Sequence, residues 1–94
     1  MSDALRDLEG VLQARARDRP EGSYTVSLLD DGELLQRKIM EESFELCLEL
    51  GRQPTVPGRI SEEAADLVFH VLVGLTRAGV RLTDVERVLV SRKR

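Results

Sequence analysis

Apolar residues recur at helical spacing along the first part of the chain. They stand three or four residues apart at Leu5, Leu8, Leu12 and Ala16. This pattern predicts an amphipathic helix, and the hydroxyl of Ser2 is suited to cap its first turn. Pro20, Gly22 and the polar stretch 23–25 then interrupt the pattern, so the first helix is expected to end before them in a loop.

A second helical pattern begins at Asp30 or Asp31 and runs to about Leu50. Gly51 follows its last apolar residue, which is the position where glycine commonly stops a helix. Residues 52–60 include two prolines and a glycine, so a loop is expected there.

A third helix is expected from Ser61 to about Gly79, and a fourth begins near Thr83. Thr83 and Glu86 have the spacing of a capping box, with the hydroxyl at N-cap and the carboxylate at N3. Alternating apolar runs typical of strands are nearly absent. We therefore predict an all-α fold: a single domain over residues 1–94, built as a bundle of about four helices.

The second predicted helix has apolar residues on both sides of a narrow polar strip. At roughly 100° per residue, the strip holds Lys38, Glu42, Glu45 and Glu49. One flank is formed by Leu35, Ile39, Leu46 and Leu50, and the other by Met40, Phe44, Cys47 and Leu48. An ordinary surface helix has one apolar stripe. This helix is therefore expected to pack against two neighbours and to leave the strip lining a groove, with Cys47 buried.

The third predicted helix has a similar arrangement. One face carries Glu63, Asp66, His70, Gly74 and Arg77, and the rest of its circumference is apolar. A chain of 94 residues holds too few core residues to cover two such helices. We therefore expect a second copy of the chain to cover them, in a symmetric homodimer of helical hairpins. The sequence leaves open whether such dimers pair further.

Composition and charge narrow the class of protein. Hydrophobic residues make up 41% of the chain and charged residues 33%, as in globular domains. With 14 Lys and Arg against 17 Asp and Glu the net charge is −3, which argues against a nucleic-acid partner. The single cysteine favours a reducing, cytoplasmic setting. The sequence shows no leader pattern, and its longest apolar run, residues 67–75, is too short to span a membrane.

The acidic residues carry the candidate chemistry. Glu42 and Glu45, like Glu63 and Asp66, are three residues apart and share a helix face. If the two helices lie antiparallel and adjacent, four carboxylates converge, and their repulsion calls for a cation. Oxygen ligands of this kind suit Mg²⁺ or Mn²⁺, which would assist the attack of water on a polyphosphate. The alternative is an ordinary solvated acidic face, as found on many charged helices.

Two segments of the chain resemble a known family. Residues 38–45, Lys-Ile-Met-Glu-Glu-Ser-Phe-Glu, and residues 62–70, Glu-Glu-Ala-Ala-Asp-Leu-Val-Phe-His, are similar to the all-α pyrophosphohydrolases of the MazG type. Residues 19–25, Arg-Pro-Glu-Gly-Ser-Tyr-Thr, resemble the phosphoribosyl-ATP pyrophosphatases of histidine biosynthesis. The likeness extends from Leu8 to Leu89. It implies a homodimeric, Mg²⁺-dependent hydrolase that converts phosphoribosyl-ATP to phosphoribosyl-AMP and pyrophosphate.

The resemblance also implies roles for particular residues. Glu42, Glu45, Glu63 and Asp66 are implied as the metal ligands and catalytic acids, and one of them would orient or deprotonate the attacking water. Lys38 would contact a phosphate oxygen, or else form an i, i+4 ion pair with Glu42. Met40 stands where a small residue is usual in the family, and the loop after Gly51 is about two residues longer.

Further substrate contacts are expected on the same faces and in the first loop. The hydroxyls of Ser23, Tyr24 and Thr25 would bind phosphate or ribose, or simply fix the turn before the second helix. His70 is either a ligand to substrate or a structural histidine. Arg77 would neutralise triphosphate charge or stabilise a helix end.

Two other functions remain open at this stage. The chain is alternatively a house-cleaning hydrolase of nucleoside triphosphates, or a helical dimer without catalytic activity that serves as a scaffold. The segment 19–25 favours phosphoribosyl-ATP as substrate. The number of metal ions, the phosphorus atom attacked and the identity of the base are left open by the sequence.

Overall fold

The computed structural model describes residues 3–93, and within that range it is all-helical, as predicted. Five helices follow one another along the described chain: α1 (Ala4–Asp18), α2 (Tyr24–Asp30), α3 (Gly32–Gly51), α4 (Pro57–Ala78) and α5 (Leu82–Ser91). The expected count of about four is too low by one, because α2 occupies the segment expected to be a loop. Within residues 3–93 no helix combines the length and apolar character needed to cross a bilayer.

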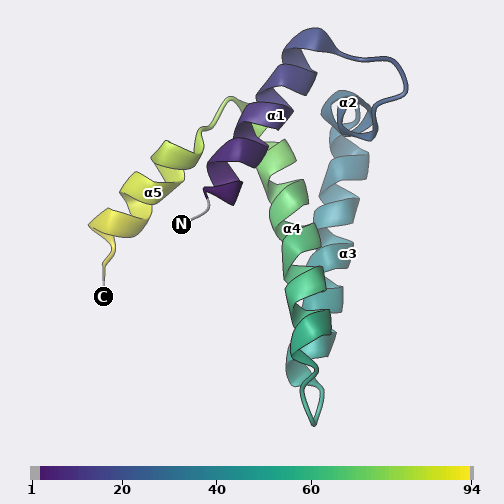
Figure 1. Cartoon of the computed structure of the whole chain (residues 1–94), viewed down its shortest axis with the longest axis vertical. Helices are drawn as coiled ribbons and strands as arrows, with labels where there is room; N and C mark the ends of the chain where they lie inside the picture. The colour runs from purple at the N-terminus through teal and green to yellow at the C-terminus, as the bar shows by residue number, and fades with distance from the viewer. Residues whose placement is uncertain (1–2, 94) are drawn as a thin grey trace.

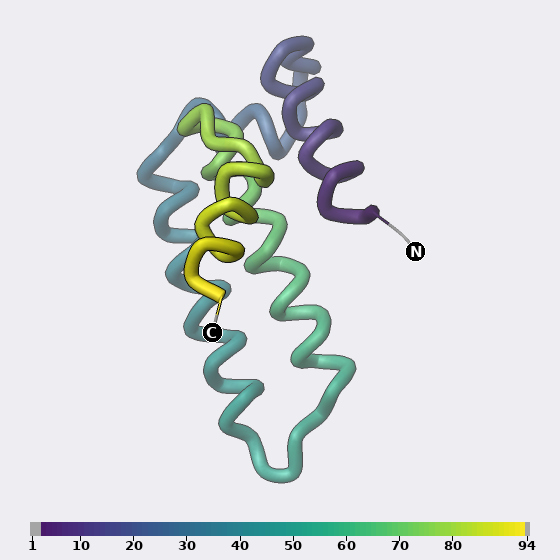
Figure 2. Tube along the Cα trace, turned by 90° about the vertical axis from the view of Figure 1, so that its left-hand side faces the viewer, coloured from purple at the N-terminus to yellow at the C-terminus, as the bar shows by residue number. Residues whose placement is uncertain are grey.

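Helices α3 and α4 form a long antiparallel hairpin that dominates the molecule (Figure 1). They are joined by a short connection at one tip. At the opposite end α1 and α2 pack across the hairpin, whereas α5 extends away from it, to the left in this view. Viewed at right angles, α3 and α4 again lie side by side along their whole length (Figure 2). The hairpin therefore brings the two acidic faces predicted from the sequence next to each other.

The additional helix α2 is capped by Ser23, whose hydroxyl accepts a hydrogen bond from the Val26 backbone N–H at 3.3 Å. Leu28 is fully buried and anchors the helix to the core. Asp31 then ends α2 and caps α3, because its carboxylate accepts the Leu34 N–H at 3.0 Å. Residues 23–25 thus form a capped helix start, and the prediction of a loop there is wrong.

The other predicted boundaries hold to within a few residues, except at the start of α4. Ser2 lies outside the described residues, and α1 starts after Asp3. Helix α4 begins at Pro57, four residues before Ser61, because proline is well suited to the first position of a helix. It ends at Gly79, which has a left-handed backbone with φ +74°.

The capping box predicted at Thr83 is displaced by two residues. Helix α5 is capped at Arg81, whose backbone N–H donates to the Asp84 carboxylate at 2.9 Å. The helix is held against α1 by polar contacts: the Leu82 N–H donates to Glu9 Oε2 at 2.7 Å. Asp84, rather than Glu86, therefore supplies the capping carboxylate.

The core lies at the end of the hairpin that α1 and α2 cover. It consists of Leu12, Leu28, Leu35, Leu72 and Val73. Toward the other end one flank of α3 is bare among the described residues. This bare flank consists of Met40, Phe44, Cys47 and Leu48, and the exposed fractions of Met40 and Phe44 are 63% and 64%. Cys47 is exposed, contrary to expectation, because no described segment of the chain covers this flank.

Candidate functional site

Three acidic side chains converge between α3 and α4. Glu42 and Glu45 come from α3 and Glu63 from α4, and one carboxylate oxygen of each lies within 4.8 Å of the other two. The i, i+3 spacing places Glu42 and Glu45 on one helix face, and the antiparallel hairpin places Glu63 opposite them. We call these three residues the acidic cluster.

The acidic cluster contains carboxylate oxygens that are buried without a partner. Glu42 Oε2 and Glu63 Oε2 are shielded from solvent and have no hydrogen-bond partner among residues 3–93. A buried anionic oxygen without a donor is costly. Mg²⁺ favours hard oxygen ligands and is typically held by only a few carboxylates, which leaves positions for water and phosphate. The acidic cluster therefore fits a divalent cation of this kind.

The pKa shifts within the acidic cluster also favour a bound cation. Burial raises the pKa of Glu42, the negative charges of Glu45 and Asp66 raise it further, and His70 opposes them. The pKa of Glu63 is also raised, first by burial and then by the proximity of Glu45 and Glu42. Both carboxyls thus resist ionisation until a positive charge compensates them.

The raised pKa of Glu63 predicts how the stability of the metal-free protein depends on pH. A carboxyl with a raised pKa in the folded state holds its proton more tightly there than in the unfolded chain. Folding is therefore penalised increasingly as the pH rises from the unfolded pKa through the folded pKa. We expect Glu63→Gln to raise the Tm at neutral pH in EDTA and to flatten the fall of Tm as the pH rises above the ordinary pKa of a glutamate.

Glu62, the exposed neighbour of Glu63, provides the control for the pH dependence of the Tm. Glu62→Gln removes the same charge from the same turn of α4, but its side chain is not part of the acidic cluster. It should leave the pH profile of the Tm unchanged. A Glu63→Gln profile that follows the wild-type profile would show that the acidic cluster stores no repulsion.

Asp66 lies beside the acidic cluster but is not one of its three members. Its side chain is exposed, and its charge contributes to the raised pKa values of both Glu42 and Glu63. One turn further along α4, His70 is buried and its Nδ1 is 2.9 Å from the Asp66 carbonyl oxygen. His70 Nε2 is 2.9 Å from the hydroxyl of Tyr24. The four acids predicted as ligands thus share one region, and Tyr24 and His70 adjoin it.

Lys38 does not pair with Glu42. Its amine lies 3.5 Å from the carboxylate of Glu41, which is exposed on the neighbouring side of α3. The i, i+4 ion pair considered from the sequence is therefore absent from this structure. Glu42 is left without a cation from its own helix.

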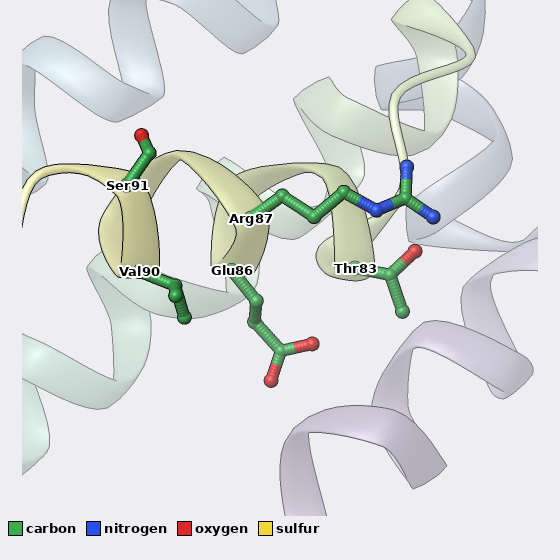
Figure 3. Close-up of a pocket in the computed structure, with 5 residues that line it drawn as sticks. All are labelled: Thr83, Glu86, Arg87, Val90 and Ser91. Carbon is green, nitrogen blue, oxygen red and sulfur yellow. The ribbon is translucent and has the colours of Figure 1, made fainter.

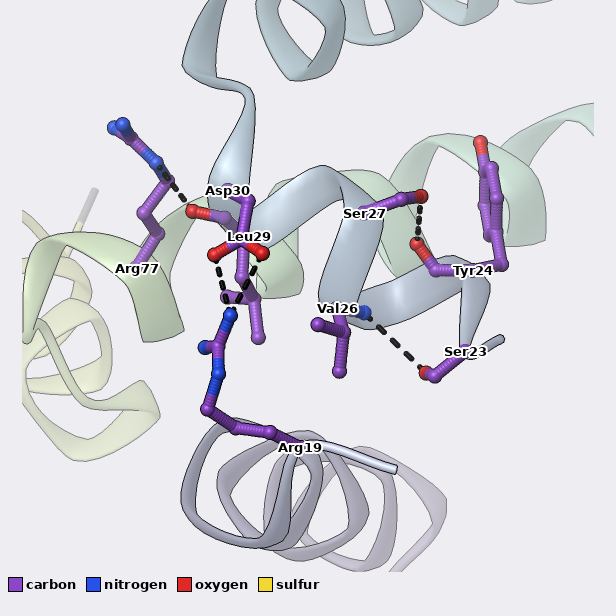
Figure 4. Close-up of polar contacts among 8 residues, drawn as sticks. All are labelled: Arg19, Ser23, Tyr24, Val26, Ser27, Leu29, Asp30 and Arg77. Atoms are coloured by element: carbon purple, nitrogen blue, oxygen red, sulfur yellow. Dashed lines mark hydrogen bonds and ion pairs between the residues drawn. The ribbon is translucent and has the colours of Figure 1, made fainter. Parts of the chain in front are cut away.

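The remaining predicted contacts take part in local structure around α2 (Figure 4). Arg77 Nε donates to the Leu29 carbonyl oxygen at 3.0 Å, so the side chain satisfies the C-terminal end of α2. Ser23 caps the other end of α2, and Thr25 is buried. The structure gives these three side chains positions that support α2, and it does not place them with the acidic cluster.

The ion pair between Arg19 and Asp30 was not predicted. Arg19 Nη2 lies 2.6 and 2.7 Å from the two carboxylate oxygens, and this pair ties the end of α1 to the end of α2 (Figure 4). The sequence does contain a signal for α2 itself. A serine three residues before Val26, followed by Leu28 and Leu29, is a capped apolar turn.

The surface of the described residues has several concave regions. An open depression of about 620 Å³ adjoins the end of α1 and the start of α2, and its lining includes Arg19, Ser23 and Tyr24. A second depression, of about 450 Å³, lies along α5 and is lined by Thr83, Glu86, Arg87, Val90 and Ser91 (Figure 3). None of the predicted site residues lines the second depression, whereas Tyr24 connects the first one to His70.

Comparison with known proteins identifies the family of the chain. Residues 5–93 match the family model described as phosphoribosyl-ATP pyrophosphohydrolase. The phosphoribosyl-ATP pyrophosphatase of Metallosphaera sedula is 40% identical over 89 residues, which cover 90% of each chain. That of Methanoregula boonei is 44% identical over 93 residues, covering 96% of this chain and 88% of the relative.

A similar sequence also occurs within a much longer protein. The histidine biosynthesis trifunctional protein of Neurospora crassa is 45% identical over 85 residues, which cover 90% of this chain. The chain spans only 9% of the length of that relative.

Proposed function

Because the chain belongs to the phosphoribosyl-ATP pyrophosphohydrolase family, we propose that it hydrolyses phosphoribosyl-ATP to phosphoribosyl-AMP and pyrophosphate in histidine biosynthesis. The observation that carries this proposal is the acidic cluster, in which carboxylate oxygens of Glu42 and Glu63 are buried without partners. An enzyme that binds a polyphosphate through a divalent cation needs such a set of carboxylates.

The cation proposed is Mg²⁺, with Mn²⁺ as a substitute. Glu42, Glu45 and Glu63 would hold it, with Asp66 beside them as the fourth acid. When bound, the ion would supply Lewis-acid polarisation of the phosphoryl oxygens and of the attacking water. Without it, the negative charges of Glu42, Glu45 and Glu63 would repel the phosphate oxygens of the substrate.

The residues of this chain would hold and move a proton during the reaction. A new bond forms between the water oxygen and a phosphorus of the anhydride that joins the nucleotide to pyrophosphate. The anhydride P–O bond breaks, and its electron pair stays with the leaving phosphate oxygen. A carboxylate of the acidic cluster takes the water proton. Glu45 is the exposed member of the acidic cluster and is therefore reachable by water.

Lys38 is proposed to contact substrate phosphate as a point charge. Its side chain is 37% exposed and lies one turn before Glu42, with Glu41 as its present partner. An exposed ion pair of this kind is weak, so a phosphate oxygen would replace Glu41 at little cost. Ser23, Thr25 and Arg77 are proposed to shape the substrate region by holding α2.

We further propose that the enzyme is a homodimer. The proposal is compatible with the pairing of two dimers. The bare flank of α3 presents large apolar side chains to solvent, among them Phe44 with 64% of its surface exposed. Contiguous apolar surface of this kind is typical of an interface. A second copy that packs its α3 and α4 hairpin on this flank would complete the bundle and enclose the polar strip of α3.

A substrate panel tests the proposed reaction. We expect release of pyrophosphate from phosphoribosyl-ATP with Mg²⁺, at least about 100-fold faster in kcat/KM than from dUTP, dCTP or ATP. EDTA should abolish the activity, and excess Mg²⁺ or Mn²⁺ should restore it. Turnover of the deoxynucleotides without turnover of phosphoribosyl-ATP would instead favour a house-cleaning hydrolase.

A further inference from the structure

The only tyrosine and the only histidine of the chain are hydrogen-bonded to each other. The Tyr24 hydroxyl on α2 is 2.9 Å from Nε2 of His70 on α4, across 46 positions of sequence. Phe69 fixes both rings: it stacks on Tyr24 at 6.3 Å and meets His70 edge-on at 5.1 Å. The hydroxyl is therefore held in one place beside α4.

The other nitrogen of His70 determines which partner donates in this hydrogen bond. His70 Nδ1 lies 2.9 Å from the Asp66 carbonyl oxygen, which can only accept. Nδ1 must therefore carry the proton, and in a neutral imidazole Nε2 then has a lone pair. The Tyr24 O–H donates to that lone pair. The single proton of the Tyr24 hydroxyl is thus committed to His70.

This commitment limits what Tyr24 can do for a ligand. Tyr24 is 49% exposed as a residue and lines an open depression, so a bound molecule can approach it. With its proton engaged, the hydroxyl oxygen offers only lone pairs. It can accept from an O–H or N–H group, but it cannot donate to a phosphate oxygen.

The position of Tyr24 connects the acidic cluster to the open depression near α1. Tyr24 lines that depression together with Arg19 and Ser23. On its other side, Tyr24 is hydrogen-bonded to His70, which in turn is hydrogen-bonded to the backbone of Asp66, the acid beside the acidic cluster. A substrate with its polyphosphate at the acidic cluster and its remaining portion in the depression would therefore pass Tyr24.

We propose that Tyr24 is a specificity residue that accepts a hydrogen bond from a donor group of the nucleoside half of the substrate, a ribose hydroxyl or a base N–H. His70 is the positioning residue that holds the Tyr24 proton. This inference rests on the proposed function, because it assumes that the acidic cluster binds the pyrophosphate half. It assigns to Tyr24 recognition of the sugar or base, and not of phosphate.

Binding of the two reaction products, phosphoribosyl-AMP and pyrophosphate, distinguishes recognition of the sugar or base from recognition of phosphate. At pH 8 with Mg²⁺, calorimetric titration of the full-length protein is expected to show that Tyr24→Phe weakens binding of phosphoribosyl-AMP by about tenfold, as for loss of one hydrogen bond. Binding of pyrophosphate should be unchanged, because it offers no donor to Tyr24. Phenylalanine retains the stacking on Phe69, so the fold is preserved.

Variants of His70 test the positioning role. His70→Gln places a neutral carbonyl oxygen at about the reach of Nε2 and should keep wild-type binding of phosphoribosyl-AMP. His70→Leu removes the acceptor and should weaken that binding, with no further loss in the Tyr24→Phe/His70→Leu double variant. Ribose 5-phosphate identifies the donor: its binding is sensitive to Tyr24→Phe if the donor is a sugar hydroxyl, and insensitive if it is a base N–H.

Two results would overturn the inference. One is a Tyr24→Phe variant that loses pyrophosphate affinity as much as phosphoribosyl-AMP affinity, and the other is a variant that binds both products like the wild type. Failure of the proposed function is a different observation, namely a wild-type protein that does not release pyrophosphate from phosphoribosyl-ATP.

Discussion

Replacing Glu42 with glutamine is expected to lower kcat/KM for phosphoribosyl-ATP at least about 100-fold and to weaken Mg²⁺ binding by a similar factor. Glu42 contributes an oxygen that is buried without a partner and lies within 4.8 Å of carboxylate oxygens of Glu45 and Glu63. Glutamine keeps the size of the side chain, but it removes the negative charge that a hard cation requires. Initial rates and calorimetric titration of Mg²⁺ measure the two effects.

The adjacent residue supplies the matched control. Glu41→Gln changes the net charge of α3 by the same amount, but Glu41 is exposed and paired with Lys38. Its effect on both quantities should stay within about threefold, as expected for a weak surface ion pair. If Glu42→Gln bound Mg²⁺ like the wild type, the acidic cluster would not be a metal site, and a scaffold without catalytic activity would be the better description.

The helical class was predictable because its signals are local. The apolar spacing from Leu5 to Ala16 and the glycine that follows α4, Gly79, are visible within a few turns of sequence. Helix α2 was missed because its seven residues contain too few periods to stand out, and because Pro20 and Gly22 suggested a longer loop. The start of α4 was placed late because Pro57 was interpreted as a breaker, although proline is favourable at the first helical position.

The acidic cluster was largely predictable, and its surroundings were not. The i, i+3 spacing of Glu42 and Glu45 places them on one face of α3. A short connection between two long helices favours antiparallel packing, which places Glu63 opposite them. The outward position of Asp66 depends on side-chain rotamers and helix rotation, which spacing does not determine. The contact between Tyr24 and His70 depends on how α2 crosses α4, and no local sequence pattern predicts the geometry of that crossing.

Replacing Phe44 with glutamate is expected to raise the dissociation constant of the proposed homodimer at least about 100-fold. Phe44 is 64% exposed in one chain and lies at the centre of the bare flank of α3, between Met40 and Leu48. Burying such a side chain in an interface contributes roughly 1.5–3 kcal/mol. An unpaired carboxylate in the same place would cost several kcal/mol more. Sedimentation velocity over a range of protein concentrations measures the shift from dimer to monomer.

The thermal stability of this variant provides the second measurement of the dimer. The core of a single chain is confined to the end of the hairpin that α1 and α2 cover, so much of the stability of the other end would come from the second copy. The Tm of the wild type should therefore rise with protein concentration, and that of Phe44→Glu should be lower and independent of concentration. Val11→Glu makes the same kind of change at a residue of α1 that is 47% exposed, and it should leave the dimer intact. A wild type that sediments as a monomer at all concentrations would contradict the proposed dimer, and the bare flank would then need another explanation.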